Sequence, residues 1–240
     1  MLASMSVDYY TQLERGNVRG VSDDVVEAVA RALRLDDVER GHLFALVRAA
    51  KQRPVQRRAA ADRVRPGVQR VLDTMTESAA FVRNRRLDML AANRLGYALY
   101  SDAFDSARRP ANLGRFVFLD SRSRDFYRNW DQVADAGVGS LRAETGRNPD
   151  DRALTDLIDE LSLGSEDFRD RWAAHDVVEY RSGTQPFRHP LVGDLLLSYE
   201  AFDVAADPGQ TIIVYSAEAG SASQAGLDRL AACTASQDVR

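Results

Sequence analysis

Gln12, Arg15 and Arg19 lie close together near the start of the chain, and their side chains are suited to contacts with nucleic acid. The amide of a glutamine can donate to N7 and accept from N6 of the same adenine, which reads a base directly. Arginines contact phosphates, and such contacts position a protein on DNA without specifying a sequence. These residue types therefore indicate a DNA-reading segment, provided that a helix presents them on one side.

Residues 6–16 are predicted to form that helix. The Ser6 hydroxyl can cap its first turn, and Gly16 tolerates the left-handed geometry in which helices commonly end. Tyr10 and Leu13 are three residues apart, so they share the face that would pack inward. The side chains expected to contact DNA, in this helix and just beyond it, are Ser6, Val7, Asp8, Thr11, Gln12, Arg15 and Arg19. An ordinary amphipathic helix with a solvated polar face has the same spacing, and the pattern alone leaves that alternative open.

The composition is typical of a soluble globular protein with one or two domains. The 240 residues are 45% hydrophobic and 28% charged, and both values are ordinary. No apolar run approaches the roughly 18 residues of a transmembrane helix, and the N-terminus lacks a basic segment followed by an apolar one. The single cysteine, Cys233, excludes an internal disulfide framework. We therefore expect a cytoplasmic protein that does not contact a membrane.

The charge is distributed unevenly along the chain. Residues 1–65 carry 12 Arg and Lys against 9 Asp and Glu, whereas the rest of the chain carries 20 against 27. A basic part joined to an acidic part suits a nucleic-acid reader with a separate sensor. The excess of positive charge in the first part is small, so it supports this interpretation without establishing it.

Residues 1–50 are predicted to form a small all-helical domain. Ser22 can cap a second helix, whose first turn holds two aspartates where the helix dipole favours negative charge. Asp36 and Glu39 have the spacing of a capping box and are expected to open a third helix. Residues 51–66 are basic and contain two prolines, which is typical of a linker. The linker is either a solvated connector or a tether that also contacts phosphates. In the second case, its contribution to DNA binding would depend strongly on salt.

Residues 67–233 are predicted to form a second domain of the α+β class, with an antiparallel sheet and helices inserted between its strands. Asn93 is expected to cap a helix over residues 94–104, and Ser221 with Gln224 has the spacing of a capping box for a last helix. Ser182-Gly183 is predicted to be a turn, and residues 234–240 a tail. Strands are expected at residues 79–84, 87–93, 176–181, 187–189, 192–202 and 210–217. Helical spacing occupies residues 68–75 and 113–161 and resumes at Ser165.

No pattern in the sequence indicates catalysis or metal binding. The chain has three histidines and one cysteine, and none of them follows a His-x-x-x-His or Cys-x-x-Cys spacing. There is no Gly-x-Ser-x-Gly elbow and no phosphate-binding loop, and Gly137-Val138-Gly139-Ser140 is too short to cradle a phosphate. We therefore expect no catalytic residue, no metal and no cofactor, and a protein that is not an enzyme.

Two sets of motifs carry a resemblance to a known family. Residues 6–16, followed by Val29-Ala30-Arg31-Ala32-Leu33-Arg34-Leu35 and His42-Leu43-Phe44, resemble a helix-turn-helix of the XRE and lambda-repressor class, and more specifically the MmyB-like regulators. Trp172-Ala173-Ala174-His175-Asp176-Val177, His189-Pro190 with Gly193, Tyr199-Glu200 and residues 215–221 resemble the ligand-binding domain of the same regulators. The resemblance covers nearly the whole chain. It implies a PAS-like fold that binds a small apolar, fatty-acid-like ligand.

The resemblance also indicates where such a ligand would bind. An apolar cavity needs aromatic walls and a few polar groups that orient the ligand. The expected wall residues are Phe116, Phe126, Trp130, Trp172, Tyr199 and Tyr215, and the residues expected to meet a carboxylate are His175, Arg181 and His189. Two alternatives remain open: the aromatic side chains are core residues, and His175 holds backbone groups at a junction between a helix and a strand.

The start of the chain departs from the family pattern, because only five residues precede the predicted recognition helix. We expect either a start codon assigned too far downstream or a natural truncation. The predicted function is a ligand-responsive regulator that binds the major groove of double-stranded DNA as a homodimer, since helix-turn-helix proteins read paired half-sites. The ligand would shift the population of two sensor arrangements. The alternative is a truncated sensor that does not bind DNA alone and acts through its ligand or through heterodimers.

Overall fold

The computed structural model describes residues 21–33, 40, 44, 47, 63–105, 109–174 and 181–235. The chain divides into two compact units, Met1–Ala60 and Ala61–Arg240. Several predicted features lie outside the described residues and stay predictions: the DNA-contacting set Ser6, Val7, Asp8, Thr11, Gln12, Arg15 and Arg19, the capping box of Asp36 and Glu39, His175, and nearly all of the strand at 176–181.

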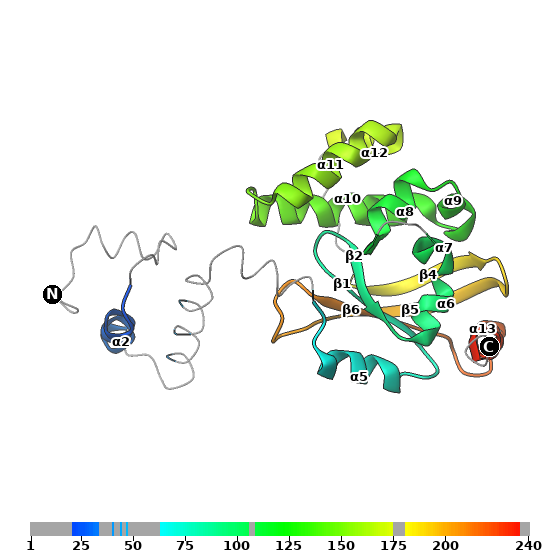
Figure 1. The fold of residues 1–240 in the computed structure, drawn as a ribbon, viewed down its shortest axis with the longest axis horizontal. Coiled ribbons are helices and arrows are strands. Elements are labelled where there is room, and N and C mark those ends of the chain that lie inside the picture. The colour runs from blue at the N-terminus through cyan, green and yellow to red at the C-terminus, as the bar shows by residue number, and fades with distance from the viewer. Residues whose placement is uncertain are drawn as a thin grey trace. The chain divides into compact units, whose positions relative to one another are not determined.

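In the first unit, the helix predicted to begin after Ser22 is confirmed as α2 (Asp23–Ala32; Figure 1). The Ser22 hydroxyl accepts a hydrogen bond from the backbone N–H of Val25 at 3.4 Å, which satisfies one of the free donors of the first turn. The apolar stripe of the helix is buried at Val26, Val29 and Ala30. Local sequence signals were sufficient here because both the cap and the stripe lie within ten residues.

The second unit is built on one antiparallel sheet, which confirms the predicted α+β class. The strands are β1 (Ala79–Arg83), β2 (Asp88–Ala92), β3 (Ala111–Asn112), β4 (Ser182–His189), β5 (Gly193–Asp203) and β6 (Thr211–Ser216). Their order across the sheet is β3-β2-β1-β6-β5-β4. The first and last strands of the domain are therefore neighbours at its centre, as in a PAS-like fold, and the long helical segment enters between β3 and β4.

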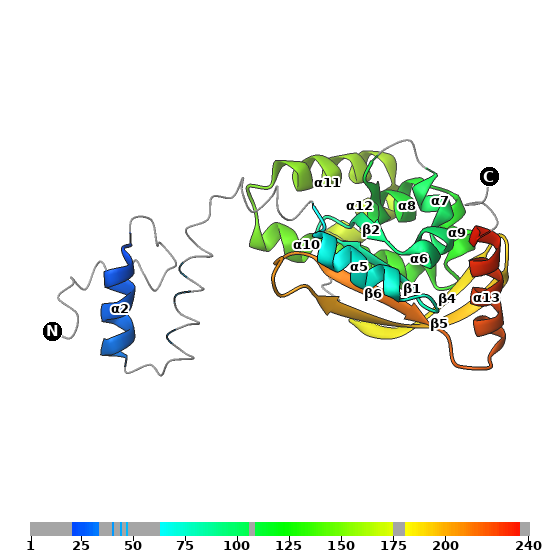
Figure 2. The same ribbon diagram turned by 60° about the horizontal axis from the view of Figure 1, so that its bottom comes forward.

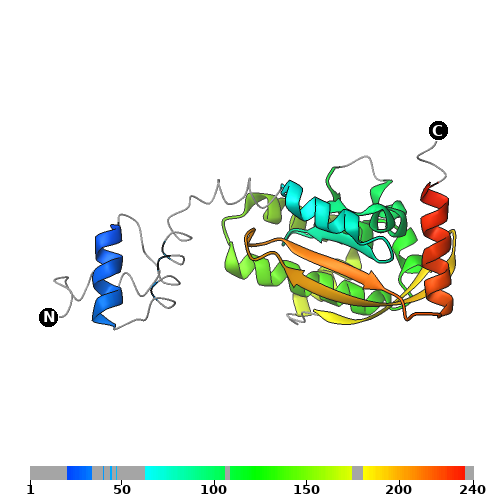
Figure 3. The same cartoon turned by 90° about the horizontal axis from the view of Figure 1, so that it is seen from below.

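Helices cover both faces of this sheet. Figure 1 shows α8 (Leu113–Leu119), α9 (Arg122–Phe126) and α10 (Trp130–Arg147) over one face, with α11 (Arg152–Gly164) and α12 (Glu166–Ala174) beyond them. The opposite face is crossed by α5 (Pro66–Thr74), as Figure 2 shows. The last helix, α13 (Ala222–Ala235), stands beside one end of the sheet (Figure 3) and packs on β5 and on α6 (Arg94–Leu99).

The alternation of side chains along the strands separates two cores. On the face under α8 to α10, Phe81 and Ile213 join a large buried cluster that contains most of the aromatic rings of the domain. On the other face, Ala80 and Val82 pack with Leu72 of α5 in a smaller cluster. Because successive residues of a strand point to opposite faces, β1 belongs to both cores at once.

Asn93 caps α6 as predicted, and its side chain also fastens the helix to the sheet. Its carbonyl oxygen accepts from the backbone N–H of Gly96 at 2.7 Å and of Ala80 at 3.0 Å. A Cβ atom at Gly96 would lie 2.3 Å from the carbonyl oxygen of Ala80, so the helix approaches β1 this closely only because residue 96 is glycine. The predicted helix 94–104 is interrupted at Tyr100, where α6 ends and α7 (Ser101–Phe104) begins.

The structure corrects the prediction of a turn at Ser182-Gly183. Both residues lie in β4, where Ser182 pairs with Glu200 and Gly183 with Tyr199. A Cβ atom at Gly183 would lie 3.2 Å from the Tyr199 ring, so this glycine makes room for an aromatic side chain on the neighbouring strand. The Ser221 hydroxyl accepts from the N–H of Gln224 at 3.1 Å as expected, whereas the Gln224 side chain donates to Asp228 instead of completing the box.

Candidate ligand-binding site

A cavity of about 400 Å³ lies between the sheet and the helices α8 and α10. This volume is within the range of roughly 300–1,000 Å³ that small-molecule sites commonly have. The sheet contributes one wall through β1, β4, β5 and β6, and the two helices contribute the opposite wall. The apolar part of the lining consists mainly of Phe81, Leu87, Leu113, Val117, Phe118, Val133, Ala136, Gly137 and Ile213.

Beyond Gln132 in its first turn, α10 presents small side chains to the cavity. Val133, Ala136, Gly137 and Ser140 line the cavity, and their spacing places them on one face of the helix. A Cβ atom at Gly137 would lie 3.8 Å from Phe118 and 4.0 Å from Leu87, which is ordinary contact. The segment Gly137-Val138-Gly139-Ser140 is too short for a phosphate cradle, and the helical spacing of its small residues is the signal in the sequence that indicates a cavity wall. Small residues at helical spacing here leave space for a ligand.

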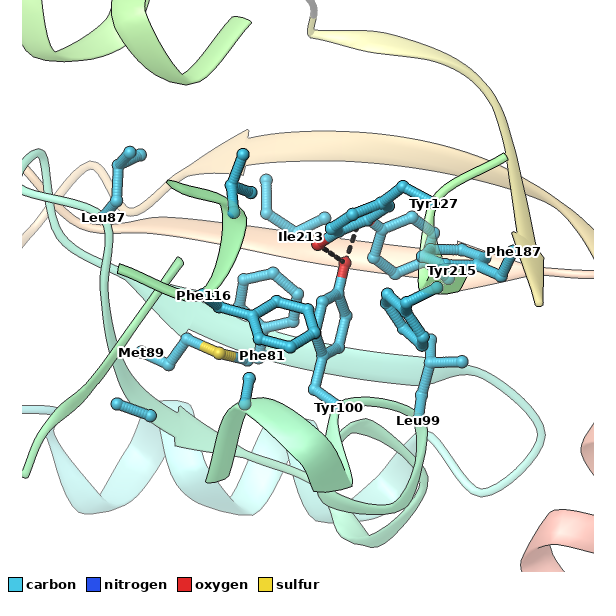
Figure 4. Packing of buried hydrophobic residues seen from close by; sticks show 14 of the residues in the cluster. Phe81, Leu87, Met89, Leu99, Tyr100, Phe116, Tyr127, Phe187, Ile213 and Tyr215 are labelled. Atoms are coloured by element: carbon cyan, nitrogen blue, oxygen red, sulfur yellow. Dashed lines mark hydrogen bonds between the residues drawn. The ribbon is translucent and has the colours of Figure 1, made fainter. Parts of the chain in front are cut away.

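Three buried tyrosines, Tyr100, Tyr127 and Tyr215, form part of the wall and are joined by their hydroxyl groups (Figure 4). The hydroxyl oxygens of Tyr100 and Tyr215 are 3.0 Å apart, and the Tyr127 hydroxyl donates to that of Tyr100 at 3.4 Å. Burial raises the pKa of all three phenols, that of Tyr215 to about 12. The hydroxyls are therefore protonated and neutral at physiological pH.

Arg83 at the end of β1 is the one charged residue among the described residues that line the cavity. It faces the same side of the sheet as Phe81, two residues earlier, and it pairs with Thr211 of β6. Its positive charge lowers the pKa of Tyr215, against the larger effect of burial. Sequence reasoning missed Arg83, although an arginine at an inward position of an alternating strand was a usable signal.

Neutral polar groups complete the lining. Asn129 and Gln132 come from the start of α10, and Thr184 and Gln185 come from β4. The side-chain amide N–H of Gln185 donates to the side-chain oxygen Oδ1 of Asn129. Among the described residues, no group of three or more His, Cys, Asp or Glu side chains is placed to hold a metal ion. The arrangement provides an apolar volume, one cation and several neutral hydrogen-bonding groups, which is a set of features suited to binding an amphiphilic small molecule.

The residues predicted to contact a ligand are divided between the cavity and its surroundings. Tyr199 and Tyr215 line the cavity. Phe116, Phe126 and Trp130 are buried in the adjoining core, and Trp172 stacks on Phe168 with a centroid separation of 5.5 Å. Arg181 is exposed and pairs with Asp203 at 2.8 Å, which holds the pKa of that carboxyl below its usual value. None of these last five residues lines the cavity.

A comparison with known protein families gives a match to the second unit. Residues 64–230, well over half of the chain, match the MmyB-like transcription regulator ligand binding domain. The chain belongs to this family. The matched range begins just before α5 and ends within α13, so the MmyB-like domain includes every element that lines the cavity. A comparison with curated proteins gave no match.

Membership of this family makes the chain a transcription regulator with a domain that binds a small molecule. A continuous sheet and the helices that cover it position the residues of the MmyB-like domain. The walls of the cavity are therefore formed mainly by regular secondary structure. No helix in the described part of the chain has the length and apolar character that crossing a bilayer requires.

His189 lies at the end of β4 in the MmyB-like domain and is 1% exposed. Its Nε2 is 3.1 Å from the carbonyl oxygen of Ala98, and its Nδ1 accepts from the backbone N–H of Leu191 at 3.2 Å. These partners assign the neutral ring, with Nε2 as the donor, and burial lowers its pKa. His189 therefore joins β4 to α6 and does not reach the cavity.

The burial of His189 has a consequence for stability. A histidine whose pKa is lowered in the folded state stabilises the fold fully above its unfolded pKa of about 6.5 and loses this contribution as the pH falls below it. We expect the free energy of unfolding of the full chain, measured by urea denaturation, to fall between about pH 7.5 and pH 5. The His189→Gln variant should have a shallower pH dependence. Equal pH dependence in the two proteins would contradict this role of His189.

Proposed function

We propose that this chain is a cytoplasmic, ligand-responsive, DNA-binding transcription regulator whose MmyB-like domain senses a small fatty-acid-like molecule, acting by binding and not by catalysis. The observation that carries the proposal is a cavity with largely apolar walls in which Arg83 is the single cationic residue among the described residues of the lining. An alkyl chain gains about 0.8 kcal/mol for each methylene that it buries. A carboxylate gains a charge-assisted hydrogen bond from an arginine. The cavity offers both to the same molecule.

The strands provide a route by which the ligand could alter the rest of the protein. Phe81 and Arg83 of β1 face the cavity, whereas Ala80 and Val82 of the same strand pack against α5. A ligand that favours one position of β1 therefore favours one packing of α5, the first helix of the domain. Such a ligand acts by shifting the population of two arrangements, and it can shift them only by its difference in affinity for the two.

The proposed partners are double-stranded DNA and a second copy of the chain. The predicted recognition segment, residues 6–16, remains the expected contact with the major groove, with Gln12 as the expected base-reading residue and Arg15 and Arg19 on phosphates. A homodimer would place two such segments on paired half-sites. The family match supports a regulator, and these finer assignments rest on the sequence motifs.

The test is a DNA-binding titration of the full chain by fluorescence anisotropy. The DNA is the upstream region of the chain's own gene, with a shuffled sequence of equal length as the control, at two salt concentrations and with or without dodecanoic acid. We expect tighter binding to the upstream DNA, weaker binding at higher salt because phosphate contacts release counterions, and a change of affinity when the acid is added. Binding of the acid without any DNA binding would instead indicate a sensor that acts through another chain. Failure to bind either would contradict the proposed function.

A further inference from the structure

The hydroxyl groups of the tyrosine cluster, Tyr100, Tyr127 and Tyr215, carry more donor protons than there are hydrogen bonds between them. Each phenol carries one donor proton, and a buried donor without an acceptor costs about 1–3 kcal/mol. Two hydrogen bonds join the three hydroxyls, one between Tyr100 and Tyr215 at 3.0 Å and one from Tyr127 to Tyr100 at 3.4 Å. Within the described part of the chain, three donors in two bonds leave one proton over. Because Tyr127 donates to Tyr100, the remaining proton belongs to Tyr100 or to Tyr215.

The side chains around this cluster offer it mainly aromatic rings. The ring of Phe81 is 5.2 Å from that of Tyr100, and the ring of Phe187 is 5.3 Å from that of Tyr215, both measured between centroids and both edge to face. Phe126 packs on Tyr100 at 5.5 Å. The three tyrosines are only 2%, 3% and 8% exposed, yet all three line the cavity. The remaining proton can therefore meet an acceptor that enters from the cavity.

The cluster and Arg83 mark two separate points of the cavity. Arg83 pairs with Thr211, and Tyr215 follows four residues later on β6. At about 3.3 Å per residue, the backbone positions of Thr211 and Tyr215 are roughly 13 Å apart along the strand. The long Arg83 side chain shortens this gap, since its charge still lowers the pKa of Tyr215. A ligand whose carboxylate lies at Arg83 thus reaches the tyrosines with the middle or far part of its chain.

We propose that the cavity selects an oxygenated acyl ligand, which carries a ketone or hydroxyl oxygen at the level of the tyrosine cluster in addition to its carboxylate. The proposal rests on the proposed function, since it assumes a fatty-acid-like ligand with its carboxylate at Arg83. An oxygen on the chain accepts the remaining phenol proton. A plain alkyl chain at this position displaces the water that would accept a hydrogen bond from this phenol. It offers no acceptor in place of that water.

The test compares dodecanoic acid with its 6-oxo, 8-oxo and 10-oxo derivatives by isothermal titration calorimetry on the full chain. Removing a single tyrosine is uninformative, because the remaining hydroxyls still hold more donors than bonds. The informative variant is the triple replacement Tyr100→Phe, Tyr127→Phe and Tyr215→Phe, which keeps the rings and removes every donor of the cluster. Tyr97→Phe is the matched control, since Tyr97 is 47% exposed and lies outside the cavity lining.

We expect one oxo isomer to bind the unmodified chain and the Tyr97→Phe control about tenfold more tightly than dodecanoic acid does. Only one isomer should gain affinity, because the phenol that donates the remaining proton has a fixed position in the cavity wall. In the triple variant, this isomer should bind no better than dodecanoic acid. Equal binding of all four acids to the unmodified chain, or a preference that persists in the triple variant, would overturn the inference while leaving the proposed function intact. If none of the four acids binds, both fail.

Discussion

The Gly137→Phe variant is expected to bind dodecanoic acid at least about 100-fold more weakly than the unmodified chain. Gly137 lies on the cavity-facing side of α10, and a Cβ atom there makes only ordinary contacts with Phe118 and Leu87. The added ring therefore enters the cavity instead of distorting the helix. Loss of three to four buried methylenes at about 0.8 kcal/mol each corresponds to a factor of about 100 in affinity.

The same helix offers a matched control for this variant. Gly146 is exposed, and a Cβ atom there would meet no atom within 4 Å. Phenylalanine is a better helix former than glycine at both positions. Gly146→Phe should therefore bind the acid like the unmodified chain, as measured by calorimetry, with thermal unfolding as the check that both variants fold. Equal affinities of Gly137→Phe and Gly146→Phe would place the ligand elsewhere.

The Arg83→Met variant is expected to bind dodecanoic acid about 30-fold more weakly, because hydrogen bonds to charged groups contribute about 1.5–3 kcal/mol. Methionine keeps a long side chain at residue 83, which is half-buried. The loss should be small for methyl dodecanoate, which has the same chain and no negative charge. The ratio of the two affinities therefore isolates the contribution of the carboxylate.

Arg85→Met is the control for a general loss of positive charge. Arg85 is two residues away and pairs with Glu144 at 3.3 Å, and it does not line the cavity. We expect this variant to bind both probes like the unmodified chain. An equal loss of acid and ester in Arg83→Met would show that Arg83 acts by packing and would contradict its role at the carboxylate.

Features that depend on a few neighbouring residues were predictable from the sequence. The caps at Ser22, Asn93 and Ser221 follow from one side chain and the backbone three residues later, and the structure confirms them. The prediction of a turn at Ser182-Gly183 was wrong for a non-local reason. Gly183 lies in β4 and makes room for the Tyr199 side chain of the neighbouring strand β5. A glycine that permits close packing and a glycine that permits a turn are identical in sequence.

The candidate site was predictable only in part. Tyr199 and Tyr215 were identified as wall residues, and both line the cavity. The sequence does not show which aromatic residues of α8 to α10 belong to the core and which line the cavity, because both kinds of position have the same helical spacing. The contact between Tyr100 and Tyr215 joins residues 115 positions apart, so no local pattern announces it.

The most direct test of where the ligand binds uses the isoleucine methyl groups as reporters. The chain has three isoleucines, Ile158, Ile212 and Ile213. Ile213 lines the cavity, whereas its neighbour Ile212 packs in the cluster with α5 on the opposite face of the sheet. In a deuterated full chain with labelled isoleucine methyl groups, dodecanoic acid that carries ordinary hydrogen on its chain should give nuclear Overhauser contacts to the Ile213 methyl. It should give none to the Ile212 methyl. Contacts to Ile212 without contacts to Ile213, or no contacts to either methyl, would contradict a ligand site between α10 and the sheet.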